Sequence, residues 1–197
     1  MRYGMAIDLR RCSGCQTCST SCKLANNLPV QAFYCRVHTK ADLTDEGMEG
    51  TQFQDTAYGT YPNDLHRVHV PLSCQHCTNL ACVDVCPTGA SYKDEETGIV
   101  LVNNEACIGC QSCMSACPYG VRVFYDSEPQ YTLGFAVGEK DAPTHLANTV
   151  EKCTFCNNRL SRDQQPKCVE SCLARARYFG DLDDPESEIS KLIAERE

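Results

Sequence analysis

The chain has 197 residues, of which 17 are cysteines and none is tryptophan, and its formal net charge at pH 7 is −8. An acidic chain without a basic stripe is a poor nucleic-acid ligand, and no apolar run approaches the roughly 20 residues that a membrane-spanning helix needs. The hydrophobic fraction of 42% includes the cysteines, so the aliphatic core is thin and another source of cross-linking is expected.

The first expected element is a short strand, Gly4 to Asp8, which leads into a group of four cysteines. This first group has the spacing C-x2-C-x2-C-x3-C, with which bacterial ferredoxins hold three corners of one [4Fe-4S] cluster and send a fourth thiolate to another. Gaps of two residues turn the chain tightly enough for successive sulfurs to meet neighbouring irons of one cube. The first group is Cys12, Cys15, Cys18 and Cys22.

Two long segments without grouped cysteines are expected to be loop insertions, residues 36–65 and 126–148. Both are rich in Gly, Thr, Asp and aromatic residues such as Tyr58, Tyr61 and Tyr131. Loops of this length are uncommon in compact domains unless they carry a role. Two interpretations stay open, namely loops that pack over the metal sites or against a partner, and plain surface excursions.

The central region repeats one pattern twice. A strand, Arg67 to Leu72, precedes the second group, and a hairpin of Ala90 to Lys93 and Ile99 to Val102 follows it. The third group comes next, before a strand-like alternation from Val121 to Tyr125. This repeat predicts a pseudo-twofold, two-cluster, ferredoxin-like inner domain over residues 66–125. The second group is Cys74, Cys77, Cys82 and Cys86, and the third is Cys107, Cys110, Cys113 and Cys117.

The fourth group and a last strand, Ala176 to Phe179, complete the pattern. We expect them to form an outer ferredoxin-like domain, made of residues 1–35 plus 149–183, that encloses the inner domain in sequence. The predicted fold class is therefore α+β, with one two-cluster domain nested in the other and long connecting loops. The fourth group is Cys153, Cys156, Cys168 and Cys172.

Residues 184–197 predict a C-terminal helix that packs on its own protein. Asp184 is suited to cap this helix, and Pro185 is suited to its first position. The apolar face of the helix would be formed by Ile189, Leu192 and Ile193.

Three other uses of the cysteines fit the sequence less well. A secreted disulfide framework pairs an even cysteine count in a short chain behind a signal peptide, whereas this count is odd and the N-terminus reads MRYGMAIDLRRC. Structural zinc sites split into two C-x2-C knuckles and have no use for a third cysteine two residues further on. Redox sensors need one or two reactive thiols rather than sixteen regularly spaced cysteines. Cubane iron-sulfur clusters therefore remain the favoured interpretation, and the apo protein should be poorly ordered.

The order of the four groups resembles the four-cluster electron-transfer subunits of the molybdopterin oxidoreductases, of the dimethyl sulfoxide and polysulfide reductase type. The resemblance covers nearly the whole chain, and the sequence segments from Cys86 to Ala90 and from Ala176 to Asp183 also match the family. The fourth group departs slightly, because Leu173 and Ala174 follow Cys172 where many relatives carry a proline.

The resemblance implies a crossed ligation, in which the first group shares its clusters with the fourth and the second group with the third. Four [4Fe-4S] clusters are implied, because all sixteen positions are Cys. We name the four implied ligand sets quartets. Quartet 1 is Cys12, Cys15, Cys18 and Cys172; quartet 2 is Cys22, Cys153, Cys156 and Cys168; quartet 3 is Cys74, Cys77, Cys82 and Cys117; quartet 4 is Cys86, Cys107, Cys110 and Cys113.

The resemblance further implies a subunit that relays single electrons and has no catalytic residues of its own. One partner would be a molybdopterin catalytic subunit, and the other a membrane quinol subunit or a soluble donor or acceptor. The runner-up is a free-standing polyferredoxin, or the equivalent subunit of a hydrogenase or carbon monoxide dehydrogenase system. No Rossmann or P-loop signature suggests a substrate site. The expected compartment is the cytoplasm, with export in the folded state beside a partner carrying a twin-arginine signal as the alternative.

Cations next to the cysteines are candidates for tuning the cluster potentials. For any single one of them, ordinary solvated surface charge is the simpler interpretation. Cys35, the seventeenth cysteine, is expected to be a semi-buried bystander, His76 a neighbour of the site rather than a ligand, and His38 a loop residue. The candidate cations are Arg11, Lys23, Lys152, Arg159, Lys167 and Arg175.

Overall fold

The structure is a computed structural model that describes residues 1–42, 66–131, 133, 135 and 137–196. Within these residues the chain forms short strands and helices in mixed order, which confirms the α+β class. The elements are β1 (Tyr3–Ile7), α1 (Thr17–Ala25), β2 (Arg36–Asp42), β3 (His66–Leu72), α2 (Ala81–Asp84), β4 (Ser91–Lys93), β5 (Val100–Val102), α3 (Ser112–Ser115), β6 (Val123–Tyr125), β7 (Thr149–Glu151), α4 (Asn157–Leu160), α5 (Lys167–Glu170), β8 (Arg177–Asp181) and α6 (Glu188–Ala194).

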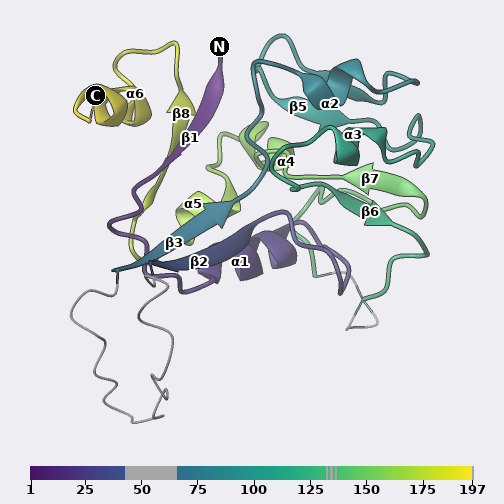
Figure 1. The fold of residues 1–197 in the computed structure, drawn as a ribbon, viewed down its shortest axis with the longest axis horizontal. Helices are drawn as coiled ribbons and strands as arrows, with labels where there is room; N and C mark the ends of the chain where they lie inside the picture. The colour runs from purple at the N-terminus through teal and green to yellow at the C-terminus, as the bar shows by residue number, and fades with distance from the viewer. Residues whose placement is uncertain (43–65, 132, 134, 136, 197) are drawn as a thin grey trace.

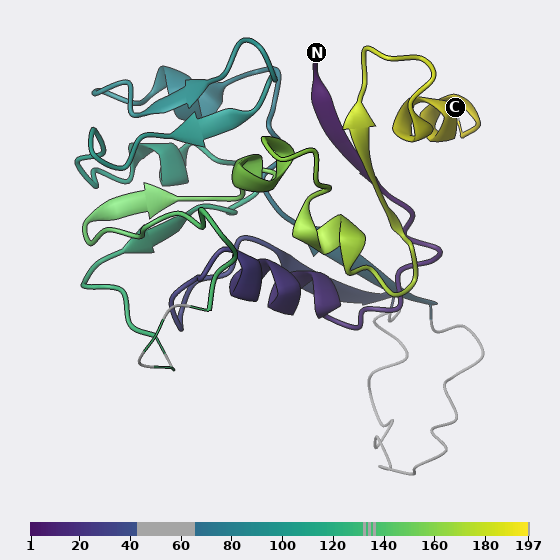
Figure 2. The ribbon, with the colours of Figure 1, turned by 180° about the vertical axis from the view of Figure 1, so that it is seen from behind.

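The described strands pair into two-stranded antiparallel sheets, β1 with β8, β2 with β3, β4 with β5 and β6 with β7. The sheet of β1 and β8 lies at one end of the molecule beside α6, and β4, β5, α2 and α3 gather at the other end (Figure 1). The sheet of β2 and β3 runs below both, next to α1, and the same arrangement is seen from behind in Figure 2. Both chain ends therefore lie at the β1–β8 end.

The structure contains the expected strands at both ends of the chain, the expected central hairpin and the expected strand before the second cysteine group. The first and last strands of the chain pair, with Met5 opposite Phe179. The central hairpin forms with Ser91 opposite Val102. The strand expected from Arg67 is β3, which begins one residue earlier.

Two strand pairings differ from the prediction. The partner of β3 is β2, which occupies the start of a segment expected to be a loop. The partner of β6 is β7, whose residues the sequence assigns to the outer domain. Tyr58 and Tyr61 of the first predicted loop lie outside the described residues.

The C-terminal helix starts later than predicted. Ser187 caps α6, because its Oγ accepts a hydrogen bond from the Ser190 amide at 3.3 Å. Asp184 instead accepts a bond from the Glu186 amide in the preceding turn. Within α6, Ile189 is buried as expected, whereas Ile193 is exposed.

The core is made of aromatic rings and thiols more than of aliphatic side chains. Ile99 and Tyr125 are fully buried and share one cluster with Phe155 and Phe179. Cys22, Cys74 and Cys153 belong to the same cluster of buried residues. This composition agrees with the thin aliphatic core expected from the sequence, and it places thiols where other small proteins bury Leu or Val.

Candidate metal centres

One backbone turn recurs in all four cysteine groups. The residue directly before the second cysteine of each group has a positive φ, namely 69° at Gly14, 45° at His76, 67° at Gly109 and 53° at Phe155. This conformation is free of strain only for glycine, so His76 and Phe155 hold a costly geometry. At His76 and Phe155 the turn brings the backbone amide of that residue within hydrogen-bond distance of the sulfur of the first cysteine. Each group is therefore shaped locally as a metal-binding loop.

Backbone amides point at several of the sulfurs. The amide of Phe155 donates to Cys153 Sγ at 3.4 Å, and the amide of His76 donates to Cys74 Sγ at 3.5 Å. Equivalent bonds run from Ser91 to Cys86 at 3.4 Å, from Val150 to Cys107 at 3.5 Å and from Ala176 to Cys172 at 3.3 Å. Such donors stabilise negative charge on sulfur, which suits thiolate ligands.

Helix packing brings together the groups that the resemblance pairs. Helix α1 of the first group packs on α5 of the fourth, and α2 of the second group packs on α3 of the third. At the first contact the hydroxyls of Ser21 and Ser171 are 2.6 Å apart. Each of these helices contains at least one predicted ligand.

The thiols of quartets 1, 3 and 4 line separate cavities. Quartet 3 lines the largest, with a volume of about 260 Å³. The four thiols of quartet 1 line a second cavity and those of quartet 4 a third, each with all four cysteines in its wall. The cavities of quartets 1 and 4 are small, about 20 Å³ and about 10 Å³, so it is the donors that indicate a cluster: four cysteine thiols are the usual ligands of an iron-sulfur cluster. The ligation itself stays a prediction.

Quartet 2 is the most deeply buried of the four sets. All four of its cysteines are buried. Burial raises the pKa of the Cys22 thiol, and the neighbouring thiols Cys153, Cys156 and Cys168 raise it further. Asn26 donates to Cys22 Sγ at 3.5 Å, which supplies a side-chain donor to this set.

Quartets 1 and 4 contain the most exposed ligand cysteines. Cys15 of quartet 1 and Cys110 of quartet 4 are exposed, in contrast to the buried thiols of quartet 2. A large apolar side chain beside each of these two quartets is exposed to solvent: Leu173 is 78% exposed beside quartet 1, and Ile108 is 64% exposed beside quartet 4. Quartets 1 and 4 are therefore the ones that another protein can approach most closely.

Cys35 is more closely involved than a bystander. Only 3% of it is exposed, and its Sγ lies 3.8 Å from Cys18 Sγ and 3.1 Å from Arg177 Nη2. A hydrogen bond from Cys35 lowers the pKa of Cys18 to about 5, and the charge of Arg177 acts in the same direction. Spacing in the sequence carries no signal for this contact, because Cys35 lies outside every group.

His76 packs as a neutral ring beside the second group. Its Nδ1 accepts a bond from the Val100 amide at 3.0 Å, and burial lowers its pKa well below the ordinary value. His38 belongs to strand β2 rather than to a loop.

Among the six candidate cations, Lys152 stands out because it is 1% exposed. Its Nζ donates to the carbonyl oxygens of Val100 and Cys153. Arg159 is also buried, but Glu139 and Glu170 neutralise it. The remaining candidates are engaged elsewhere or exposed: Lys23 binds the carbonyls of Pro29, Val30 and Ala32, Arg11 binds the hydroxyl of Tyr178, Lys167 pairs with Glu139 and Glu170, and Arg175 is exposed.

Two further buried cations were not predicted from the sequence. Arg122 and Arg177 are each 5% exposed, and both lie among cysteines. Arginine is usually exposed, so nothing in the local sequence marks these two.

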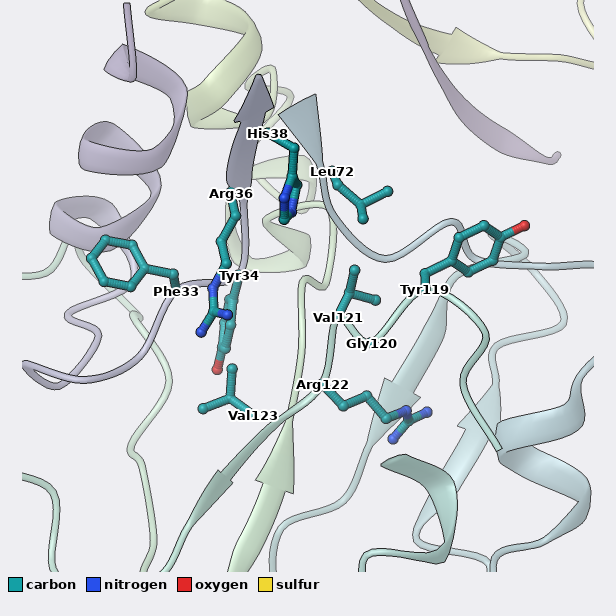
Figure 3. Close-up of a pocket in the computed structure, with 10 residues that line it drawn as sticks. All are labelled: Phe33, Tyr34, Arg36, His38, Leu72, Tyr119, Gly120, Val121, Arg122 and Val123. Carbon is teal, nitrogen blue, oxygen red and sulfur yellow. The ribbon is translucent and has the colours of Figure 1, made fainter. Parts of the chain in front are cut away.

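A cavity of about 100 Å³ between the start of β2 and the segment before β6 has no cysteine in its wall. Figure 3 shows Phe33, Tyr34, Arg36 and His38 on one side of it and Tyr119 on the other. This cavity is therefore distinct from the thiol-lined ones.

Four sets of thiols, amide donors to sulfur and buried cations define an iron-sulfur protein. The chain belongs to the 4Fe-4S dicluster domain family, whose profile matches residues 65–132 and 140–182. Among the described residues, none of the helices is long and apolar enough to cross a membrane. No three His, Cys, Asp or Glu side chains of the described residues converge as they would on a single metal ion.

Relatives of the chain are subunits of redox enzymes. The chain is 43% identical over 198 residues to a Halobacterium salinarum protein described provisionally as an iron-sulfur subunit of dimethyl sulfoxide reductase, covering 98% of this chain and 71% of the relative. It is 37% identical to the arsenate respiratory reductase iron-sulfur subunit of a Shewanella species, covering 98% and 87%. It is 40% identical to a sulfite dehydrogenase subunit of Allochromatium vinosum, covering 99% and 75%. The resemblance predicted from the cysteine pattern is confirmed.

Proposed function

We propose that this chain relays single electrons through four [4Fe-4S] clusters, between a molybdopterin catalytic subunit and a second redox partner. The observation that carries the proposal is the grading of the quartets, buried in quartet 2 and exposed at Cys15 and Cys110. When bound, each cluster exchanges one electron at a time. The chain itself contributes thiol ligands, amide donors and burial, and it supplies no catalytic residue.

Crossed ligation in quartets 1 to 4 is part of the proposal. Support comes from the packing of α1 on α5 and of α2 on α3, and from the four thiols in each of three cavity walls. The nested arrangement belongs here too, with an outer domain of residues 1–35 plus 149–183 and an inner domain of 66–125. The pairing of β1 with β8 supports the outer domain. The pairing of β6 with β7 argues for extending the inner one by residues 149–151.

For the partners, we propose that quartet 1 faces the catalytic subunit and quartet 4 faces the other redox partner. That partner is a membrane quinol subunit or a soluble protein. The bare apolar side chains Leu173 and Ile108, one beside each of these quartets, support two docking faces. The proposed compartment is the cytoplasm; recovery of the complex from the outer face of the cytoplasmic membrane would instead favour export of the folded chain with its partner.

The experiment uses the chain purified together with its large subunit. Replacing Cys110 with Ser is expected to block turnover with the physiological donor or acceptor and to spare turnover with a dye that reaches the catalytic subunit directly. The isolated chain is expected to turn over no substrate. Loss of dye-linked activity in an intact Cys110→Ser complex, or substrate turnover by the isolated chain, would contradict the relay.

A further inference from the structure

We propose that three buried cations, Arg177, Lys152 and Arg122, each occupy one gap between successive quartets and raise the potentials of both clusters that flank that gap. The proposal rests on the four-cluster relay and assigns a role to residues within it. It differs from the tuning of single clusters by surface charge, because each cation here acts on a pair of neighbours.

Arg177 lies between quartets 1 and 2. Its Nη1 donates to Cys168 Sγ of quartet 2 at 3.5 Å. Its Nη2 donates to Cys35 Sγ at 3.1 Å, and Cys35 Sγ in turn is 3.8 Å from Cys18 Sγ of quartet 1. One guanidinium group thus reaches both quartets, directly on one side and through a buried thiol on the other.

Lys152 lies between quartets 2 and 3. Its Nζ donates at 2.9 Å to the carbonyl oxygen of Cys153, a member of quartet 2. It also donates to the carbonyl oxygen of Val100, which lines the cavity of quartet 3 together with all four thiols of that quartet.

Arg122 lies between quartets 3 and 4. It lines the cavity of quartet 3, and its Nη1 donates at 3.0 Å to Ser91 Oγ. Ser91 lines the cavity of quartet 4, and its amide donates to Cys86 Sγ. Figure 3 shows the Arg122 side chain leaving the backbone on the side opposite Val123. Its Nη2 is buried without a hydrogen-bond partner among the described residues.

The charge of these three cations is not cancelled by acids. In the part of the chain that the structure describes, none of the three forms an ion pair with a carboxylate. Arg159 is the contrast, because it is equally buried and donates to both Glu139 and Glu170. The neighbouring groups of negative charge for Arg177, Lys152 and Arg122 are the thiolate quartets themselves.

Coulomb's law gives the consequence for electron transfer. A positive charge in a low-dielectric gap stabilises an added electron on either side of that gap by a similar amount. Reduction of both flanking clusters becomes easier, while the difference between their potentials changes little. An electron that leaves one quartet for the next therefore stays within the field of the same cation.

The test is an anaerobic redox titration of the purified complex, followed by electron paramagnetic resonance. Signals are assigned to quartets with one Cys→Ser variant for each. The neutral variants are Arg177→Gln, Lys152→Met and Arg122→Gln, and the charge-keeping variants are Arg177→Lys, Lys152→Arg and Arg122→Lys. Arg159→Gln is the matched control, since it removes a buried arginine that carboxylates already neutralise.

Each neutral variant is expected to lower the potentials of the two flanking clusters and to leave the other two unchanged. The expected change in each reduction equilibrium is at least tenfold, about 59 mV for a one-electron couple. The charge-keeping variants should retain most of the potential, and Arg159→Gln should shift it by much less. A shift confined to one cluster, a uniform shift of all four, or an equal effect of Arg159→Gln would overturn the proposal.

Iron content separates this inference from the function on which it rests. If all three neutral variants lost iron, the cations would serve assembly alone and the proposal would be wrong. A wild-type complex with four titrating clusters and no pairwise shifts in the variants would refute the inference and leave the relay standing. A wild-type chain without iron and sulfide would refute the relay itself.

Discussion

His76 and Phe155 stack on each other with ring centroids 3.8 Å apart and an angle of 28° between the rings. Each is the residue before the second cysteine of its pair, and each has a positive φ. The equivalent positions of the first and third groups are Gly14 and Gly109, which take this conformation without strain. The stack thus holds two strained turns together, one from the second group and one from the fourth, and compensates for the strain by burying both rings.

Loss of this stack should destabilise the protein. Phe155→Ala is expected to cost about 3 kcal/mol of unfolding free energy, because a buried aromatic ring leaves a cavity. A double-mutant cycle with His76→Ala should give a coupling of about 1 kcal/mol, as for other aromatic pairs. Both are measured by anaerobic denaturant unfolding. Phe135→Ala, at an exposed ring, is the control and should change little; a coupling near zero would mean that the two rings do not support each other.

Gly109→Ala should be far more harmful than Gly120→Ala. Both glycines have positive φ values, 67° and 59°, so both substitutions cost about 1–2 kcal/mol in backbone strain. A methyl group at Gly109 would also lie 2.4 Å from the carbonyl oxygen of Asn148, whereas nothing lies within 4 Å at Gly120. Gly109→Ala should therefore lower both stability and iron content, measured by denaturant unfolding and iron analysis. Equal effects of the two variants would show that the close approach at Gly109 is relieved easily.

Cys35→Ala should keep all the iron and lower the potential of the quartet 1 cluster. The reason is that the thiol of Cys35 donates to Cys18 Sγ, and removing a donor destabilises added negative charge on sulfur. Cys35→Ser retains a donor and should have the smaller effect. Redox titration and iron analysis check both variants. A loss of about four irons per chain, the content of one cubane, would instead identify Cys35 as a ligand.

Cys172→Ser should disturb the cluster of Cys12, Cys15 and Cys18. This follows from crossed ligation, since Cys172 lines the cavity of quartet 1 rather than joining its sequence neighbours. Site-resolved spectroscopy of the variant provides the measurement. Selective loss of the cluster held by Cys153, Cys156 and Cys168 would reject the crossed pairing.

Anaerobically purified protein should contain about sixteen irons and sixteen acid-labile sulfides per chain, four of each for every quartet. Removing the iron with a chelator should abolish most of the ordered secondary structure, because thiols occupy the core and the aliphatic part of it is small. Elemental analysis and circular dichroism test the two statements. Near-stoichiometric zinc with little iron would contradict the first, and an unchanged spectrum of the apo protein would contradict the second.

The sequence predicts local structure here better than long-range structure. The strands around Met5 and Phe179 and the hairpin at Ser91 follow from alternation and turn residues. Strand β2, with the sequence RVHTKAD, shows no clear alternation, and it is recognised only from its pairing with β3. Strand β7 is as short as the strands of the hairpin at Ser91, but no turn joins it to a neighbouring strand in sequence; it exists because Val150 pairs with Phe124 across a long connection. The later start of α6 reflects competition between two capping residues, Asp184 and Ser187.

The candidate metal centres show the same difference between local features, which the sequence predicts, and long-range contacts, which it does not. Within each C-x2-C run, cysteine spacing predicts which thiols lie close together, because that is a property of a short turn; the ligand sets themselves stay a prediction. It carries no information on Arg122 and Arg177, whose burial depends on what the fold brings around them. The contact of Cys35 with Cys18 and Arg177 joins three separate parts of the chain, so it too required the structure.

The pairing of β1 with β8 also orders events during synthesis. Residues 3–7 are made well before their partner strand, residues 177–181. The hairpin of β4 and β5 meets its own partner within a few residues. Because chains fold progressively from the N-terminus as they are made, the central part can fold while the first cysteine group still lacks its partner strand. Cys12 to Cys22 are therefore expected to stay as unprotected thiols until residues 177–181 have been made, and protection of these thiols, rather than of the central ones, should limit the yield of intact protein.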